Sequence, residues 1–342
     1  MTTTVQTKKM TDCERVANYC AGVLEGTIPA CSYVMLAVER YMRDLETGHE
    51  RGLYFDTEAA QLTVDLCRLF QHFEGKWAGE AFEPEDWQLF LFWQLFGWMR
   101  ADGTRRFRVG YIEVPRGNGK TFLASLLGNY LTFGDGEPGA QVYAAATKMD
   151  QAKLIHEPAI WMVKASPAFM ARAEIRVNNI SVPETHSSFR PVGKDAKKLD
   201  GFKPHGAILD ELHEHPDGST WDVMRSGMGK RRQPLLLGIT TAGFNPHGFC
   251  AQTRDRVIKI LERVFDDDAW FGIIWTIDDG DDWKEKSSWI KANPNYGVSV
   301  DPVDFEAMAH EAIESPHLVN NFLTKKLDIW TTQEVRWANM VK

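Results

Sequence analysis

The stretch "RRFRVGYIEVPRGNGKTFLASLLGNYLTF", residues 105–133, decides the fold. Its first ten residues alternate and are rich in β-branched and aromatic side chains, which predicts a strand. Residues 121–133 carry the apolar pattern of a helix, and a glycine-rich segment joins the two. A strand, a glycine-rich turn and a helix in this order are typical of a loop that binds phosphate groups.

The joining segment "VPRGNGKT", residues 114–121, departs from the pattern G-x-x-x-x-G-K-[ST] at its first position, where Val114 replaces glycine. A side chain is acceptable there if Val114 lies at the end of the strand. Gly117 and Gly119 allow close approach to phosphate oxygens, Lys120 supplies a point charge for the β- and γ-phosphates, and the Thr121 hydroxyl can bind Mg²⁺. A chance G-K-T at the start of a helix is the alternative. The predicted loop residues that bind ATP are Pro115, Arg116, Gly117, Asn118, Gly119, Lys120 and Thr121.

A second candidate half of the site is "GAILDELHEH", residues 206–215, an apolar strand that ends in two acids. Asp210 is predicted to hold Mg²⁺, and Glu211 is predicted to orient the attacking water. The guanidinium of Arg116 could stabilise charge that develops on the γ-phosphate. The alternative is a strand that ends in solvated acids. The separation of 90 residues from Lys120 to Asp210 leaves room for at least one strand inserted between the two motif strands.

Two weaker signals accompany these motifs. The strand pattern "GITTAG", residues 238–243, ends in Thr240 and Thr241, which could sense the γ-phosphate and couple hydrolysis to motion. In "FEPEDWQ", residues 82–88, the amide of Gln88 could read an adenine edge. An ordinary strand end explains the first pattern nearly as well.

The rest of the chain predicts an α/β fold. Apolar strand patterns at 140–147, 173–182, 205–212 and 234–243 alternate with helical patterns such as 150–166, which indicates a mainly parallel sheet covered on both faces. Residues 10–80 and 303–330 read as helical. The predicted division is a helical N-terminal segment at 1–80, the nucleotide-binding core at 81–275, and a helical segment with a linker at 276–342.

Composition excludes few classes of function. The chain of 342 residues has 39 basic and 47 acidic residues, so bulk charge does not favour coating of nucleic acid, although local patches can still bind DNA. Its five cysteines form no C-x-x-C pair, and no zinc site is expected. No apolar run has the length of a membrane span, and the first residues lack a signal peptide. A soluble, intracellular protein without membrane contact is expected.

Taken together, the motifs resemble the large terminase subunits of tailed double-stranded-DNA phages, which pump genomes into procapsids. The segments that carry this resemblance are "EPEDWQLFLFWQLFGW", "RRFRVGYIEVPRGNGKT", "AAATKMDQA", "LDGFKPHGAILDELHEH", "MGKRRQPLLLGITTAG" and "WIKANPNYG", in order from about Cys31 to Trp330. The resemblance implies a RecA-like, additional-strand P-loop ATPase core, a helical lid and a C-terminal RNase H-like nuclease. It also implies ATP and Mg²⁺ as cofactors. Its implied partners are double-stranded DNA, a portal protein, a small terminase subunit and copies of the chain in a ring, at the procapsid portal in the cytoplasm of an infected bacterium.

The family's site residues are implied at matching positions. Lys120 and Thr121 correspond to the Walker A lysine and hydroxyl, and Arg116 to the arginine that precedes them. Asp210 and Glu211 correspond to the Walker B acids. The implied coupling motif is Thr240, Thr241 and Gly243, the adenine-recognition glutamine is Gln88, and the arginine that reaches a neighbour's site is Arg231 or Arg232.

The end of the chain departs from the family pattern. Only twelve residues follow Trp330, and they hold no spaced aspartates for two metal ions. The acids at 266–268 and 278–282 are expected in solvated loops. The expectation is therefore an ATPase domain without the nuclease domain.

Two other functions remain open from the sequence. "DELH" also fits a DExH helicase of superfamily 2, but the arginine-rich motif of such helicases is missing, since no Gly-Arg dipeptide occurs in the chain. A scaffold that binds nucleotide without hydrolysing it is the other alternative, and the intact Lys120, Thr121, Asp210 and Glu211 argue against it.

Overall fold

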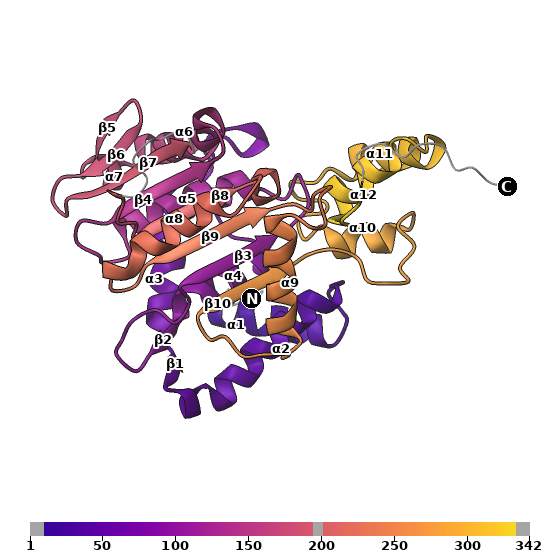
Figure 1. Ribbon diagram of the computed structural model, residues 1–342, viewed down its shortest axis with the longest axis horizontal. Helices are drawn as coiled ribbons and strands as arrows, with labels where there is room; N and C mark the ends of the chain where they lie inside the picture. Colours follow the sequence, from indigo (N-terminus) through magenta and orange to yellow (C-terminus); the bar gives the residue numbers. More distant parts are fainter. Residues whose placement is uncertain (1–9, 194–200, 333–342) are drawn as a thin grey trace, which may run out of the picture.

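The computed structural model describes residues 10–193 and 201–332, and a twisted central sheet organises them (Figure 1). The sheet has eight strands in the order β10-β3-β9-β8-β4-β7-β6-β5. Their bounds are β3 Val109–Glu113, β4 Gln141–Ala146, β5 Glu174–Arg176, β6 Asn179–Val182, β7 Ser187–Gly193, β8 Gly206–Asp210, β9 Leu235–Thr240 and β10 Trp270–Ile274. All pairs from β10 to β7 are parallel, and β6 and β5 continue the sheet in antiparallel fashion. The predicted α/β fold with a mainly parallel sheet is confirmed.

The strand inserted between the two motif strands is β9. It pairs with β3 on one side and with β8 on the other. Because all three strands are parallel, their carboxyl ends meet at one edge, and Glu113 lies beside Thr240 in the register. The segments that follow β3, β8 and β9 therefore converge at this edge.

Helices cover both faces of the sheet. The helices are α1 Asp12–Leu24, α2 Ser32–Thr47, α3 Thr57–Cys67, α4 Asp86–Gly97, α5 Lys120–Phe133, α6 Met149–Ala165, α7 Pro167–Met170, α8 Ser219–Gly227, α9 Phe249–Leu261, α10 Lys286–Ala292, α11 Pro302–Glu314 and α12 Val319–Leu327. Close packing occurs at strand glycines: Gly206 lies against Leu131 of α5, and Gly272 lies against Val257 of α9. The short strands β1 Leu53–Phe55 and β2 Trp98–Arg100 form a separate antiparallel pair.

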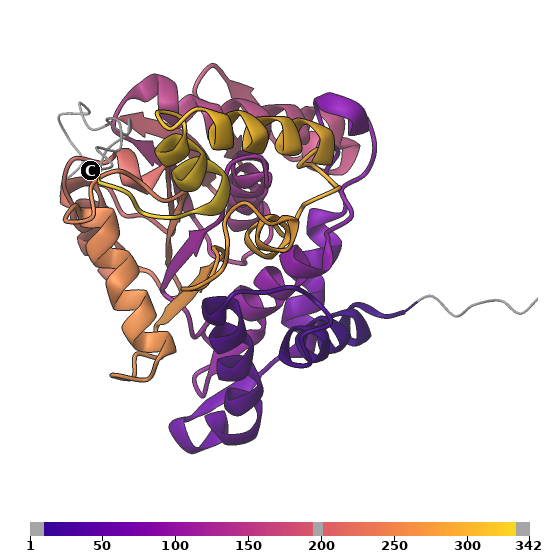
Figure 2. The same cartoon turned by 90° about the vertical axis from the view of Figure 1, so that its right-hand side faces the viewer.

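Two hydrophobic clusters divide the described residues. The larger cluster runs from Val16 to Trp275 and joins the N-terminal helices to the sheet. The smaller cluster, which includes Trp289, Phe305 and Phe322, holds α10, α11 and α12 together. These three helices and the segments that join them, called the lid here, lie beyond the carboxyl ends of the central strands (Figure 1) and in front of the sheet in Figure 2.

Some predicted elements differ from the structure. Residues 173–182 form a hairpin, β5 and β6, because a two-residue turn at Val177 and Asn178 reverses the chain. The helical pattern at 303–330 is divided into α11 and α12, and Pro316 explains the break because the residue before proline disfavours helical geometry. The strands β7 and β10 are additional to those expected.

The described residues also contain short turns of 3₁₀ helix. They are η2 Gly75–Trp77, η4 Leu212–Glu214 and η5 Met228–Lys230, and a fourth, η1 Gly48–Arg51, lies beside β1. None of the described helices has the length and apolar character that crossing a membrane requires.

Candidate active site

The phosphate loop lies between β3 and α5. Gly117 has φ of 100° and Gly119 has φ of 79°, both in the left-handed region that residues with a Cβ rarely adopt. Val114 is fully buried, and its N–H donates to the Thr240 carbonyl at 3.1 Å, so it extends β3 alongside β9. The first glycine of the pattern is therefore dispensable here, because its position continues a strand.

Lys120 occupies the first turn of α5 and points back into the loop. Its ammonium nitrogen donates to the carbonyl oxygens of Val114 at 3.0 Å and Pro115 at 3.3 Å. Burial lowers its pKa, while the nearby carboxylates of Glu211 and Asp210 oppose that shift. The lysine is thus a buried cation that faces both acids.

The acid pair follows β8, as the sequence predicts. Burial and the neighbouring charge of Glu211 raise the pKa of Asp210 to about 6, while Lys120 and a hydrogen bond with the Thr121 side chain act in the opposite direction. Glu211 has φ of 47°, and its Oε2 is buried without a hydrogen-bond partner. The structure therefore brings Lys120, Thr121, Asp210 and Glu211 together at one edge of the sheet.

The end of β9 is tied to the segment that follows Glu211. The hydroxyl of Thr240 donates to the Thr241 carbonyl at 2.8 Å and accepts from the backbone N–H of His213 at 3.1 Å. A Cβ on Gly243 would lie 3.0 Å from the Cβ of His213. The proximity of His213 to Thr240 became visible only in the folded chain.

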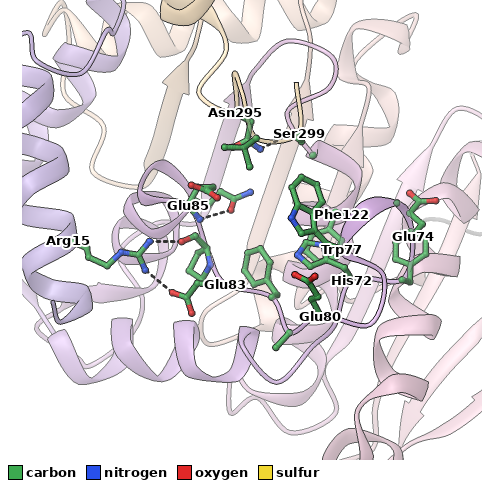
Figure 3. Close-up of a pocket in the computed structure, with 18 residues that line it drawn as sticks. Arg15, His72, Glu74, Trp77, Glu80, Glu83, Glu85, Phe122, Asn295 and Ser299 are labelled. Atoms are coloured by element: carbon green, nitrogen blue, oxygen red, sulfur yellow. Dashed lines mark hydrogen bonds and ion pairs between the residues drawn. The ribbon is translucent and has the colours of Figure 1, made fainter. Parts of the chain in front are cut away.

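A cavity of about 650 Å³ opens beside the loop (Figure 3). Gln88 lines it from the first turn of α4, where its Oε1 accepts from the N–H of Glu85 at 3.0 Å, which leaves the amide nitrogen for a ligand. Phe122 lines it from α5 and stacks on His72 with ring centroids 4.6 Å apart. Gly119 also lines this cavity, so a planar ring bound there would adjoin the phosphate loop. The aromatic residues of this cavity were missed in the sequence.

The lid holds the phosphate loop through a buried hydrogen-bond network. The side chain of Asn118 donates to Asn293 Oδ1 at 2.9 Å and accepts from the N–H of Asn295 at 3.0 Å. Ser299 Oγ donates to the Gly117 carbonyl at 2.6 Å. Asn295 Oδ1 in turn accepts from Trp87 Nε1 at 2.7 Å, which links the lid to α4. The loop is thus positioned by the lid as well as by the sheet.

Arg116 lies between the loop and the lid. Its N–H donates to the Lys325 carbonyl at 2.9 Å, and its side chain lines a second cavity, of about 430 Å³, together with Lys325 and Lys326 of α12. Its Nε is buried without a hydrogen-bond partner. Lys326 has a lowered pKa because of burial and because Arg116 and Lys120 repel its charge. The positive charges of Arg116, Lys120 and Lys326 therefore repel one another in this region.

Arg231 and Arg232 lie apart from this cluster. They precede β9, whereas the loop and the acids follow the carboxyl ends of their strands. Arg231 donates to the Lys203 carbonyl at 2.9 Å and lies 3.5 Å from Glu137, with a side chain only 13% exposed. Neither arginine can therefore contribute to the site of its own chain.

The predicted acidic loops at 266–268 and 278–282 contain residues with defined partners. Asp268 forms an ion pair with Arg106 at 2.7 Å, and Lys291 lies 3.0 Å from Asp278 and 2.7 Å from Asp281. Across residues 10–193 and 201–332, no group of three or more histidine, cysteine, aspartate or glutamate side chains is arranged to hold a metal ion. The Mg²⁺ position predicted from the sequence involves one carboxylate and one hydroxyl.

Comparison with solved structures supports the same architecture. The crystal structure of the HK97 bacteriophage large terminase superposes with a TM-score of 0.69 at 20% sequence identity, covering 79% of this chain and 55% of that one. At this identity the similarity shows a shared fold.

Sequence relatives cover part of the chain. Protein YmfN of Escherichia coli (strain K12) is 43% identical over 148 residues, which make up 43% of this chain and 32% of that protein. The terminase large subunit of Lactococcus phage p2 is 22% identical over 193 residues, or 55% of this chain and 35% of that protein. The chain thus spans about a third of the length of these relatives.

Two family models match the chain in succession. The model of the terminase large subunit endonuclease domain matches residues 264–341, which contradicts the expectation that nothing of the nuclease domain is present. The expectation failed because it relied on acidic motifs, whereas the described part of the match consists of β10, which joins the ATPase sheet, and the lid. The model of the terminase large subunit ATPase domain matches residues 86–259, just over half of the 342 residues, and contains the phosphate loop, the acid pair and β9. The chain therefore belongs to the terminase large subunit family.

Proposed function

We propose that this chain hydrolyses ATP and uses the free energy to move double-stranded viral DNA into a procapsid. The observation that carries the proposal is the convergence of Lys120 and Thr121 with Asp210 and Glu211, in a chain whose family model is that of an ATPase domain. A lysine alone would support binding of nucleotide. The second acid is what hydrolysis requires, because a carboxylate beside the γ-phosphate can orient water.

ATP would occupy the space between the phosphate loop and the 650 Å³ cavity. Its base would lie against Phe122, with the free amide nitrogen of Gln88 directed at its edge. The backbone N–H groups of residues 117–121 would surround the phosphates. Lys120 would exchange the carbonyl oxygens of Val114 and Pro115 for the β- and γ-phosphate oxygens.

The residues present fit Mg²⁺. Asp210 is a buried carboxyl whose pKa is raised to about 6, so a nearby cation would favour its ionised form, and the Thr121 hydroxyl already forms a hydrogen bond with it. Asp210 and Thr121 would hold the ion, directly or through water. When bound, Mg²⁺ neutralises charge on the β- and γ-phosphates.

The remaining roles concern water and motion. Glu211 would orient the attacking water, and Arg116 would stabilise negative charge on the transferred phosphoryl group. Thr240, Thr241 and Gly243 would respond to loss of the γ-phosphate and pass the change to the lid. Because the lid contacts the loop through Asn118, movement of either would displace the other.

The partners follow from the family. Double-stranded DNA, a portal protein and a small terminase subunit are the proposed partners, and several copies of the chain would form a ring at the procapsid portal in the cytoplasm of an infected bacterium. In such a ring Arg231 or Arg232 would serve the site of a neighbouring subunit. Arg231 would first have to leave Glu137.

Phosphate release measured on the full chain tests the proposed activity. We expect hydrolysis by the wild type and a loss of roughly 10²- to 10⁴-fold in Glu211→Gln, which keeps the shape of the side chain but removes its basicity. Equal rates near background for both proteins would refute ATP hydrolysis. On a forked DNA duplex we expect no strand displacement, whereas unwinding would favour the helicase alternative.

A further inference from the structure

His213 lies between two parts of the site that are separate in sequence. It belongs to η4, two residues after Glu211, and its side chain is only 8% exposed. Its Nδ1 is 3.0 Å from the hydroxyl oxygen of Thr240 and 3.3 Å from Glu211 Oε2. One imidazole nitrogen is thus within reach of both the acid and the end of β9.

Two hydroxyl groups surround Nδ1 of His213. The hydroxyl proton of Thr240 is directed at the Thr241 carbonyl, so the Thr240 oxygen can only accept from His213. With its proton on Nδ1, His213 donates to the Thr240 oxygen, and the Thr241 hydroxyl oxygen lies 3.4 Å from the same nitrogen. Burial lowers the pKa of His213, although Glu211 and Glu214 oppose the shift, which favours a neutral ring.

Glu211 has an unsatisfied oxygen on the same side. Its Oε2 is buried and has no hydrogen bond to the described residues, although His213 Nδ1 is 3.3 Å away. A buried carboxylate oxygen without a donor is unfavourable. A small rotation of the imidazole would transfer the Nδ1–H hydrogen bond from Thr240 to this oxygen.

The segment after β9 packs directly on His213. A Cβ on Gly243 would lie 3.0 Å from the His213 Cβ, so the glycine permits this approach. Movement of residues 240–243 would therefore displace the imidazole. The contact offers a physical route from the coupling segment to Glu211.

We propose that His213 is a positioning residue for hydrolysis. Its neutral imidazole donates the Nδ1 proton to Thr240 or to Glu211 and thereby sets whether the carboxylate is held in the orientation that activates water. The inference rests on the proposed ATP hydrolysis. It assigns to His213 no contact with nucleotide, so binding of ATP and the rate of turnover should respond differently to its replacement.

Steady-state phosphate release by the full chain tests this role. For His213→Ala we expect kcat to fall roughly 10- to 100-fold, as is common for groups that orient a reacting residue, with KM for ATP changed by less than about twofold. His213→Asn should recover most of the rate, because its amide nitrogen can occupy the position of Nδ1. His213→Gln should not, because its amide extends to the position of Nε2. The comparison of His213→Asn with His213→Gln tests the role of Nδ1 even if His213→Ala fails to fold.

Two further variants define the partner groups. In a Glu211→Gln background, His213→Ala should cause no further loss, because its effect passes through the carboxylate. Glu214 lies 3.2 Å from Nε2 and is 54% exposed, so Glu214→Gln should remain near the wild-type rate. If kcat falls as much in Glu214→Gln as in His213→Ala, then Nε2 is the nitrogen whose hydrogen bond matters, and the proposal is overturned.

Other outcomes also overturn it. These are an unchanged kcat in His213→Gln, equal rates for the Asn and Gln variants, or an additive loss on top of Glu211→Gln. A wild type no faster than Lys120→Ala would instead refute the proposed ATPase activity. An active wild type with a fully active His213→Gln variant would refute only the role of His213.

Discussion

The ammonium nitrogen of Lys120 donates a hydrogen bond to the carbonyl oxygen of Val114 at 3.0 Å. The lysine is therefore bound by the very loop whose backbone is expected to receive phosphate. The charge of this lysine is buried and only partly offset by Glu211 and Asp210. A bound triphosphate would supply further negative charge, and its oxygens would take the place of the loop carbonyls as hydrogen-bond acceptors.

Replacement of this lysine should abolish tight binding of ATP. For Lys120→Ala we expect affinity to fall roughly 10- to 100-fold, the equivalent of one hydrogen bond to a charged group, and hydrolysis to be lost. Calorimetric titration with a non-hydrolysable ATP analogue measures the affinity. Lys153→Ala is the matched control, because that lysine lies on α6 and pairs only with exposed Asp150. Unchanged affinity in Lys120→Ala would move the site elsewhere.

Gln88 allows base recognition to be separated from helix stability. Its Oε1 accepts from Glu85 N–H at the start of α4, so Gln88→Glu keeps this acceptor and removes the amide donor. We expect Gln88→Glu to lose preference for ATP over GTP while its melting temperature stays near that of the wild type. Gln88→Ala should lose both the preference and about 0.5–2 kcal/mol of stability. Competition binding and thermal unfolding provide the readouts, and retained ATP preference in Gln88→Glu would contradict the assignment.

The loop–lid network predicts a loss of stability when Asn118 is shortened. Asn118→Ala would leave Asn293 Oδ1 and the Asn295 N–H buried without this partner, at a cost of about 1–3 kcal/mol for each group that stays unsatisfied. Urea unfolding should report the change as a lower midpoint. The exposed Asn18 provides the control, since Asn18→Ala should leave the midpoint in place. A wild-type midpoint in Asn118→Ala would show that the network adds nothing to stability.

Acid should destabilise the fold through His156. This side chain is fully buried on α6, its Nε2 contacts the Phe189 carbonyl at 3.0 Å, and burial lowers its pKa to about 4. An unfolded histidine titrates near 6.5, so between these values the unfolded chain binds more protons, and stability declines as pH falls from about 6.5 to 4. The contribution is as much as roughly 3 kcal/mol. His156→Gln should flatten this part of the pH–stability curve measured by urea unfolding, and an unchanged slope would assign acid sensitivity to other groups.

The phosphate loop and the acid pair could be located from the sequence because each motif is local. Gly117 and Gly119 both have a positive φ, which favours glycine. Asp210 and Glu211 come at the end of an apolar strand. Each motif can therefore be recognised within a few residues. The spacing from Lys120 to Asp210 predicted an intervening strand, but β9, which separates β3 from β8 in the sheet, follows Asp210 in the sequence. The roles of these residues remain predictions, although the structure places their side chains together.

What the sequence could not predict depends on contacts between distant segments. His213 became relevant only when β9 placed Thr240 beside it, and Asn118 only when the lid placed Asn293 against the loop. The five apolar residues of β10 are compatible with either a strand or a buried helix, and pairing with β3 resolves the ambiguity. Tertiary packing therefore supplied the information that composition and spacing lack.

The pairing of β10 with β3 has a practical consequence for dividing this protein. β10 lies in the stretch matched by the endonuclease model, but it flanks the strand that carries the phosphate loop. A fragment ending at residue 259 would uncover the backbone of β3 along one side and remove the buried residues of β10 from the core. Such an exposed edge invites intermolecular association. Fragments meant for expression should therefore extend past β10, because the boundary of the ATPase-domain match at residue 259 leaves out a strand of the central sheet.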